Sequence, residues 1–361
     1  MKVYVAATRQ NDGKTIVSLG LLKAFQKTGK SIGYMKPVGQ QYRLIGGKKI
    51  DKDVVLMRDI LGLQDDLSAM NPLAVPRGFT EDYILRGSRE ALVNAVKDGY
   101  QRVCEGKDCF LIEGTGHAGV GSVFDMSNAD VASLLGARVI IVSSGGIGRP
   151  IDEIMLNKAN FDKQNVEVLG AIVNKVLPEK YDKVNRIVRR GLERQGIEVF
   201  GVIPHDDLLS NPSVAELLDD LKGELLSGGR GLHNLVARFV IGVMRPHDVL
   251  DTFVGNTLLI VPGNREEVIL AALSGYILGE TQVPPISGMI FTCGIRPHPK
   301  IMDLLRYTNI PLILVDEDSF TVATQINGMI FKLRSEDKEK IMKVESLIAK
   351  YVDIDRVAQL L

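Results

Sequence analysis

The stretch that decides the fold is Lys2-Val-Tyr-Val-Ala-Ala-Thr-Arg-Gln-Asn-Asp-Gly-Lys-Thr15. Its first residues form a short apolar run typical of a β-strand, and the apolar residues from Ile16 to Phe25 recur at helical spacing. A strand, a polar turn ending in Gly-Lys-Thr and a helix are the arrangement of a phosphate-binding P-loop. In such a loop, backbone N–H groups and the helix N-terminus present partial positive charge to a phosphate. We therefore predict a nucleotide site at this turn.

Two side chains at the end of the turn have distinct predicted roles. Lys14 would reach the β- and γ-phosphates and assist catalysis, and the hydroxyl of Thr15 would bind Mg²⁺. The common P-loop pattern has a glycine five residues before Gly13, where this chain has Thr8. The regular pattern is therefore only partly matched, and a chance Gly-Lys-Thr at a helix start is the alternative interpretation.

A second strand, Ser31–Met35, ends in Lys36-Pro-Val38. Lys36 would then lie at the sheet edge where ligands of open α/β folds bind. Together, Val5–Thr15 and Gly33–Val38 resemble dethiobiotin synthetases, the cobyrinic acid a,c-diamide synthases and the dethiobiotin synthetase-like N-terminal part of some long phosphotransacetylases. The resemblance implies an elongated P-loop and places Lys36, as a second catalytic residue, near a reacting carboxylate or carbamate. The residues that it implies for ATP binding are Thr8, Asn11, Asp12, Gly13, Lys14, Thr15, Ile16, Asn174 and Pro204.

Two carboxylates join Thr15 in the predicted magnesium site. Asp53 lies near the start of a helix that we expect to end at about Leu61, where it could equally be an ordinary first-turn carboxylate. The family resemblance implies that Asp53 contributes to the Mg²⁺ site. Glu113 ends the apolar run that begins at Cys109, a pattern typical of a buried parallel strand, and it could bind Mg²⁺ directly or through water.

The glycine-rich loop after Glu113 is the candidate substrate site. It reads Gly-Thr-Gly-His-Ala-Gly-Val-Gly-Ser, where dethiobiotin synthetases carry a shorter segment, and it is closer to the phosphotransacetylase-linked branch of the resembled family. The candidate substrate residues are Gly114, Thr115, Gly116 and His117. His117 could serve catalysis or could simply hydrogen-bond its neighbours, and the sequence leaves both interpretations open.

The strands after residue 137 indicate which nucleotide base the chain binds and which fold it adopts. Asn174-Lys is followed by Leu177 where guanine-reading GTPases have an aspartate, so ATP is favoured over GTP. The Gly-Gly-x-Gly segment at 145–148 is predicted to be a structural turn. Strands and helices alternate as far as Pro204, which predicts an α/β fold with a doubly wound, mostly parallel P-loop NTPase sheet.

We predict a P-loop domain over residues 1–222, a second, smaller α/β domain over 223–334 and a C-terminal helical segment over 335–361. Gln41–Lys49 is predicted to be a mobile loop, and a linker is expected between Leu208 and Gly231. The second domain has three strand–helix units and resembles the DRTGG domain. The residues that carry this resemblance are Thr257–Leu273, Thr292–Gly294, Arg296, Pro297 and Asp318–Thr324, with Asn264 and Cys293 departing from the pattern.

Composition excludes some partners. Lys+Arg and Asp+Glu are both 44, so no global basic field points to nucleic acid or to an acidic membrane surface. No apolar run approaches the ~18 residues of a membrane span, and no signal-peptide pattern opens the chain. The three cysteines lack metal-ligand spacing, which fits a reduced, cytoplasmic protein.

Three functions compete. An ATP-dependent enzyme would phosphorylate a small-molecule carboxylate or carbamate for attack by an amine, and the DRTGG-like domain would regulate it. A nucleotide-responsive regulator or ligand sensor would show slow or no ATPase activity. In this second hypothesis, Arg9 could cross to the nucleotide of the other subunit in a homodimer, or it could be a surface residue. The third possibility is a degenerate, structural P-loop. We expect no phosphotransacetylase catalytic domain within this sequence.

Overall fold

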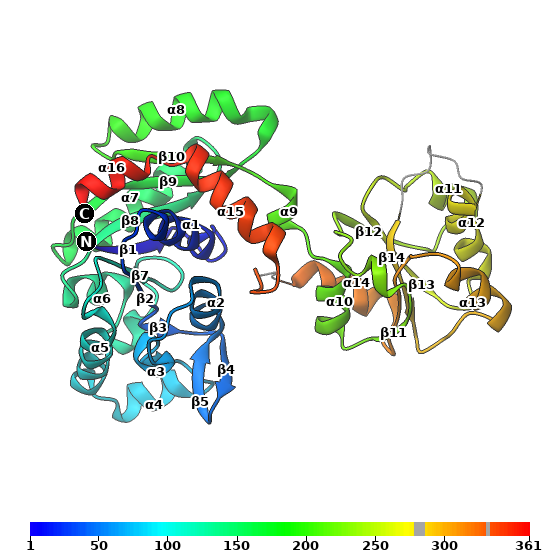
Figure 1. The fold of residues 1–361 in the computed structure, drawn as a ribbon, viewed down its shortest axis with the longest axis horizontal. Helices are drawn as coiled ribbons and strands as arrows, with labels where there is room; N and C mark the ends of the chain where they lie inside the picture. The colour runs from blue at the N-terminus through cyan, green and yellow to red at the C-terminus, as the bar shows by residue number, and fades with distance from the viewer. Residues whose placement is uncertain (278–285, 330–332) are drawn as a thin grey trace. The chain divides into compact units, whose positions relative to one another are not determined.

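The computed structural model describes residues 1–277, 286–329 and 333–361 and divides the chain into two compact units (Figure 1). The first unit contains Met1–Asp206 and Leu333–Leu361, and the second contains Asp207–Lys332. The second unit is therefore an insertion in the sequence of the first. The predicted boundary lies at residue 222, and residues 335–361 are predicted as a separate segment. In the structure, residues 207–222 belong to the second unit and the C-terminal helices to the first.

A six-stranded parallel sheet forms the centre of the first unit, in the order β10-β9-β8-β1-β7-β2. The strands are β1 (Lys2–Ala7), β2 (Ile32–Met35), β7 (Cys109–Glu113), β8 (Arg138–Ser144), β9 (Val168–Val176) and β10 (Val199–Pro204). They are almost wholly buried, as expected for strands covered on both faces. The predicted α/β fold with a mostly parallel sheet is confirmed. Because the strands are parallel, their carboxyl ends share one edge.

Helices connect and cover these strands. They are α1 (Lys14–Lys27), α2 (Lys52–Leu61), α3 (Leu67–Met70), α4 (Phe79–Arg86), α5 (Arg89–Cys104), α6 (Asn128–Leu134), α7 (Gly148–Lys163), α8 (Tyr181–Glu193), α15 (Lys338–Tyr351) and α16 (Ile354–Leu360). Several begin at caps that the sequence supplies. Ser88 accepts a hydrogen bond from the Ala91 N–H group, and Ser127 forms a capping box with Asp130.

The segment predicted as a mobile loop forms a β-hairpin instead. Strands β4 (Tyr42–Ile45) and β5 (Lys48–Asp51) pair antiparallel. Gly46 and Gly47 both have positive φ, 54° and 78°, which allows the tight turn between the strands. A second small ladder joins β3 (Val38–Gly39) to β6 (Leu73–Ala74). Both ladders follow the strand that ends beside Lys36.

The C-terminal helices pack on the P-loop helix and on the edge strand of the sheet (Figure 1, red on blue and green). Ile348 of α15 is 1% exposed and lies against Gly20 of α1, where an added Cβ would be 2.1 Å from Ile348 Cγ1. Arg356 of α16 forms two hydrogen bonds with Glu198, of 2.7 and 3.1 Å. Residues after the inserted unit therefore complete the first unit.

The second unit has a five-stranded sheet in the order β11-β15-β14-β13-β12, with β11 antiparallel to β15 and the others parallel. Its strands are β11 (Glu224–Ser227), β12 (Arg238–Ile241), β13 (Thr257–Pro262), β14 (Ile286–Thr292) and β15 (Leu312–Leu314), and its helices are α9 (Asp207–Ser210), α10 (Val214–Leu221), α11 (Pro246–Leu250), α12 (Glu266–Ile277), α13 (Pro299–Arg306) and α14 (Ser319–Gly328). The stretch expected as a linker thus contains α10 and β11. Two strands at the sheet edges, β11 and β12, were not predicted.

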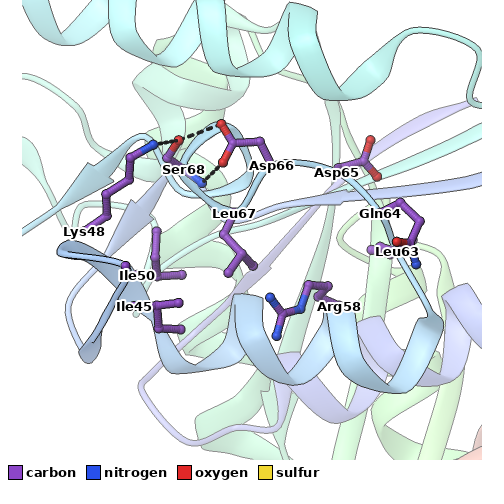
Figure 2. A pocket seen from close by; sticks show the side chains of 11 residues that line it. Ile45, Lys48, Ile50, Arg58, Leu63, Gln64, Asp65, Asp66, Leu67 and Ser68 are labelled. Carbon is purple, nitrogen blue, oxygen red and sulfur yellow. Dashed lines mark hydrogen bonds between the residues drawn. The ribbon is translucent and has the colours of Figure 1, made fainter.

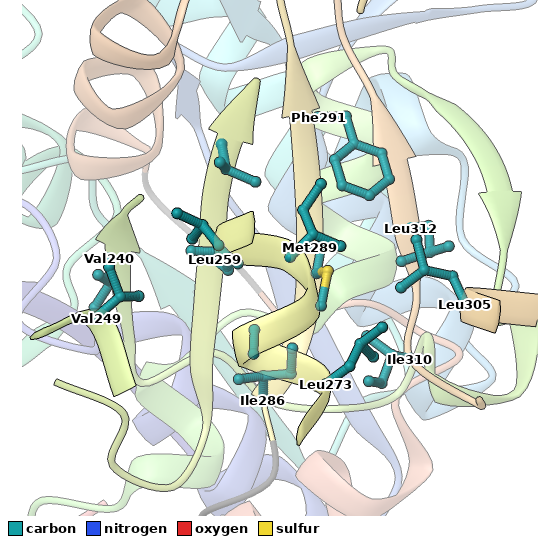
Figure 3. Packing of buried hydrophobic residues seen from close by; sticks show 14 of the residues in the cluster. Val240, Val249, Leu259, Leu273, Ile286, Met289, Phe291, Leu305, Ile310 and Leu312 are labelled. Carbon is teal, nitrogen blue, oxygen red and sulfur yellow. The ribbon is translucent and has the colours of Figure 1, made fainter. Parts of the chain in front are cut away.

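Both faces of this second sheet are covered. Alternate residues of β13 and β14 point to opposite sides, so Leu259, Met289 and Phe291 belong to one apolar cluster (Figure 3). Leu258 and Ile290 belong to the other, which includes residues of α10 and α14. This three-layer arrangement confirms a second, smaller α/β domain. Among the described helices of both units, none is long and apolar enough to cross a membrane.

Candidate functional site

The turn between β1 and α1 has the geometry of a phosphate-binding loop. Gly13 lies at the N-cap of α1 with φ 99°, and no side chain among the described residues caps this helix. Its first N–H groups are therefore available to an anion. Thr8, which replaces the expected glycine, anchors the turn: its hydroxyl oxygen lies 2.7 Å from Asp12 Oδ2 and 3.1 Å from Ser143 Oγ. Asp12 also accepts a hydrogen bond from the Arg9 N–H group at 2.7 Å.

Two residues at the carboxyl end of strand β9 brace the same turn from the other side. Asn174 Nδ2 donates to the carbonyl of Asp12 at 2.9 Å, and Lys175 Nζ donates to the carbonyl of Asn11 at 2.8 Å. A Cβ at Gly13 would be 2.1 Å from Asn174 Nδ2, so only glycine fits there. The structure therefore places Asn174 against the P-loop. Its predicted role in ATP binding stays a prediction.

Lys14 is buried and has no protein partner. The residue is 9% exposed, and among the described residues its ammonium group has no hydrogen bond or ion pair. Burial lowers the pKa of Lys14, and this effect outweighs the attraction of nearby Glu113. An ammonium group that is largely removed from water and has no protein acceptor is costly. Its position therefore calls for an anionic ligand.

Glu113 sits between Thr15 and a tyrosine that the sequence did not single out. Thr15 Oγ1 donates to Glu113 Oε1 at 2.8 Å, and Tyr34 Oη donates to Glu113 Oε2 at 3.1 Å. Burial raises the pKa of the Glu113 carboxyl, and the charge of Asp53 raises it further. Thr15, Glu113 and Asp53, predicted as metal-binding residues, are thus brought to one edge of the sheet.

Lys36 is the second buried lysine of the site, and unlike Lys14 it is paired. Its ammonium group donates to Asp51 Oδ1 at 2.9 Å and to Asp53 Oδ2. Burial by itself lowers the pKa of Lys36, but these two carboxylates reverse the shift and hold it above its ordinary value. Lys36 is thus a fixed, charged ammonium group near the P-loop.

The fit of this edge to Mg²⁺ can be judged from its donors. Among the described residues no group of three or more His, Cys, Asp or Glu side chains is arranged to hold a metal ion by itself. One hydroxyl and two carboxylates are present, in Thr15, Asp53 and Glu113. Mg²⁺ at nucleotide sites is commonly held by one or two carboxylates together with substrate phosphates and water. The donor set fits Mg²⁺ that arrives with a nucleotide.

The glycine loop after Glu113 is held by two asparagines. Asn128 Oδ1 accepts from the Thr115 N–H group at 3.0 Å, while its Nδ2 donates to the carbonyls of Thr115 and His117 at 2.7 and 2.6 Å. Asn157 Oδ1 accepts from Ala118 N at 2.7 Å. His117 is exposed, and its Nδ1 accepts from the Gly119 N–H group at 3.2 Å. This contact corresponds to the second interpretation of His117 given above, a histidine that hydrogen-bonds its neighbours. A catalytic role of His117 stays a prediction.

Comparison with known proteins agrees with this geometry. A family described as an AAA domain, AAA_26, matches residues 1–213, more than half of the 361 residues. The chain belongs to this AAA domain family. A second family, described as the DRTGG domain, matches residues 216–329.

The curated relatives of this AAA domain chain include two named phosphate acetyltransferase. One from Pseudomonas aeruginosa is 26% identical over 99% of this chain and 51% of its own length. One from Nitrosomonas europaea is 23% identical over 97% of this chain and 50% of its own length. The chain spans about half the length of these relatives.

Solved structures that match part of this chain include the MinC:MinD cell division protein complex of Aquifex aeolicus. It is 16% identical, with a TM-score of 0.38, over 58% of this chain and 83% of that one. The CBS and DRTGG domains of the regulatory region of Clostridium perfringens pyrophosphatase, complexed with the activator diadenosine tetraphosphate, are 14% identical. That similarity has a TM-score of 0.26 and covers 46% of this chain and 82% of that one.

Other predicted residues of the AAA domain lie around this centre. Arg9, with a side chain that is 53% exposed, pairs with Glu153, which also accepts from Arg149 Nε at 2.9 Å. Its crossing role in a homodimer stays a prediction. Ile16 lies in the first turn of α1, and Pro204 ends β10 at the same sheet edge.

A separate hollow of about 450 Å³ lies between the β4–β5 hairpin, α2 and residues 63–68 (Figure 2). Lys48 Nζ donates to Ser68 Oγ at 3.0 Å, and Ser68 in turn donates to Asp66 at 2.8 Å. Arg58 pairs with its neighbour Asp59 at 2.7 Å. The two cationic side chains that line this hollow, Lys48 and Arg58, therefore have protein acceptors, whereas Lys14 has none among the described residues.

The sequence analysis missed several residues that organise the site, namely Tyr34, Asp51, Asn71, Asn128 and Glu153. Asp51 could have been found from the sequence, because an aspartate directly before a predicted helix is a common N-cap residue. The others act through contacts between segments that are far apart in sequence, and a single sequence carries no signal for these.

Proposed function

We propose that the chain binds ATP together with Mg²⁺ at the carboxyl edge of the first sheet. The observation that carries the proposal is the unpaired ammonium group of the largely buried Lys14 beside the uncapped N-terminus of α1. A phosphate would supply the missing acceptors of both groups. The AAA domain family of residues 1–213 supports a nucleotide as the source of that phosphate.

Thr15, Asp53 and Glu113 would hold the metal ion. Bound Mg²⁺ would neutralise negative charge on the phosphate oxygens. Thr15 and Glu113 already contact each other, and Tyr34 fixes the second oxygen of Glu113. The protein contribution is thus a set of oxygen donors whose orientation is set before the nucleotide arrives.

For the reaction, we propose that the γ-phosphate of ATP is transferred to a small carboxylate or carbamate with release of ADP, and that an amine then attacks the resulting acyl phosphate and displaces phosphate. Lys36 would stabilise the negative charge that develops on the transferred group, as a fixed ammonium group can. The glycine loop held by Asn128 and Asn157 would contact the acceptor. The phosphate acetyltransferase activity named for the relatives is not part of this proposal, because the chain spans only half of their length.

A nucleotide-responsive regulator is the second candidate function, and one observation favours it. The DRTGG-containing unit is inserted between β10 and α15, and α15 packs on the P-loop helix α1 through Ile348 and Gly20. An event in the inserted unit could thus bias the nucleotide site through this packed helix, and the coupling would act equally in both directions.

Turnover separates the two functions. Full-length protein with Mg·ATP is incubated with a panel of small carboxylates and amines, and release of ADP is measured. An enzyme shows ADP release that one carboxylate–amine pair stimulates at least ~10-fold. A regulator binds ATP without such stimulation. Absence of both binding and turnover would refute both functions.

A further inference from the structure

The ammonium group of Lys36 is held by fewer acceptors than it has donors. It carries three N–H donors, and among the described residues its acceptors are Asp51 Oδ1 and Asp53 Oδ2. The residue is 5% exposed, and Asp51 and Asp53 are 0% and 3% exposed. One N–H donor of Lys36 therefore remains for a ligand. The direction of this donor depends on the acceptors that hold the other two, Asp51 and Asp53.

Asp51 is itself fixed by two main-chain N–H groups and by the side chain of Asn71. Its Oδ1 accepts from the Asp53 N–H group at 2.9 Å, as the N-cap of α2, and its Oδ2 accepts from the Gln41 N–H group at 3.2 Å. Its own N–H group donates to Asn71 Oδ1 at 2.8 Å. Asp51 can thus hold Lys36 without help from Asp53, which is a proposed metal-binding residue.

Asn71 joins the main chain of Lys36 to that of Asp51. While its Oδ1 accepts from Asp51, its Nδ2 donates to the carbonyl of Lys36 at 2.8 Å. The Lys36 N–H group donates to the Met70 carbonyl at 2.9 Å. The main chain of Lys36 and its ammonium group are therefore both held by the buried pair Asp51 and Asn71.

Gly39 packs directly against Asp51 and Asn71. A Cβ at this position would be 2.7 Å from Asp51 Cβ and 2.8 Å from Asn71 Nδ2, so any other residue would push the pair aside. Polar pairs buried this completely are costly unless every group is satisfied. Here the contacts of Asp51 and Asn71 converge on one lysine.

We infer that Asp51 and Asn71 are positioning residues, which aim the remaining donor of Lys36 at the group transferred from ATP. The inference rests on the proposed function. Asp51 keeps Lys36 in place whether or not Asp53 binds Mg²⁺. A displacement of about 1 Å at a reacting group can cost ~10²-fold in rate, so loss of this pair is expected to reduce turnover more than nucleotide affinity.

The test uses full-length protein and four variants. Asp51→Asn keeps an N-cap for α2 but removes the charge that holds Lys36. Asn71→Ala removes the bridge, and Gly39→Ala displaces the pair without changing any charge. The matched control is Asp66→Asn, at the exposed N-cap of α3. For each, kcat and KM for ATP hydrolysis, ADP affinity by calorimetry, and hydrogen exchange of peptides covering residues 36–41 are measured.

The first three variants are expected to lower kcat ~10–100-fold while KM for ATP and ADP affinity stay within about threefold. Hydrogen exchange over residues 36–41 should accelerate in nucleotide-free protein. Asp66→Asn should match the wild type in every measurement. A purely structural role would instead lower ADP affinity along with kcat.

Two further outcomes separate this inference from the proposed function. Wild-type turnover in Asp51→Asn and Gly39→Ala, or equal losses of kcat and ADP affinity, would overturn the inference alone. A wild-type chain that neither binds nor hydrolyses ATP would overturn the proposed function, and the inference with it.

Discussion

The two buried lysines of the site should respond in opposite ways to the same substitution. Lys14 is 9% exposed and unpaired, whereas Lys36 is 5% exposed and bound to two carboxylates. We predict that Lys14→Met stabilises the nucleotide-free protein and that Lys36→Met destabilises it. Methionine is close in length to lysine, so the two changes differ mainly in the charge environment that they remove.

The expected magnitudes follow from these environments. For Lys14, burial of the ammonium group outweighs the attraction of Glu113, as the lowered pKa shows. The Lys14 ammonium group has no protein acceptor among the described residues but keeps some access to solvent, so its removal is expected to return roughly 1 kcal/mol, the low end of the cost of an unsatisfied donor. For Lys36, the substitution leaves Asp51 and Asp53 without their cation, and breaking a buried ion pair from one side typically costs about 3–5 kcal/mol.

Differential scanning calorimetry of full-length, nucleotide-free protein measures both effects. A change of 1 kcal/mol moves the midpoint of a domain of this size by about 2–4 °C. The transition of the first unit should rise for Lys14→Met and fall for Lys36→Met, with Lys97→Met on the exposed surface of α5 as the control. Midpoints that fall for both site variants would refute the electrostatic reasoning about Lys14.

Other expectations concern packing and reactivity. Ile348→Ala should lower the free energy of unfolding of the first unit by about 2–5 kcal/mol, because a buried side chain against Gly20 of the P-loop helix is lost. The control Met342→Ala, at an exposed position of the same helix, should change this free energy by less than about 0.5 kcal/mol. Urea unfolding of both variants measures the difference. Burial raises the pKa of the Cys109 thiol to about 11, so at pH 8 it is almost wholly protonated and unreactive, whereas exposed Cys293 should be alkylated first. Mass spectrometry after brief iodoacetamide treatment at pH 8 checks this order, and modification of Cys109 in folded protein would contradict it.

The sequence predicted the sheet of the first unit well because its strands are continuous apolar runs, each followed by a helical pattern. Local signals of this kind also located Lys14 and Thr15 at the start of α1 and Glu113 at the end of β7. The hairpin over residues 42–51 was missed because Ile50 and Asp51 are the only buried residues of its two strands, so the strands lack the alternation of buried apolar and exposed polar residues that marks a half-buried strand. β11 and β12 were missed for similar reasons of length and exposure.

The partners of the site residues could not be predicted in the same way. Thr8 in place of glycine looked like a defect of the motif, yet its hydroxyl group contacts Asp12 and Ser143, and the second of these is 135 residues away. The pairing of Lys36 depends on Asn71, which bridges segments 35 residues apart. Contacts of this kind arise from topology, and spacing along one sequence does not encode them.

The central claim is that Lys14 is completed by a phosphate of ATP. Calorimetric titration of Mg·ATP into full-length wild-type protein and into Lys14→Met tests it most directly, with GTP as the competing nucleotide. The account predicts that the wild type binds ATP more tightly than GTP and that Lys14→Met loses at least ~10²-fold in ATP affinity while remaining folded. Equal ATP affinity in the two proteins, or no binding of ATP by the wild type, would contradict it.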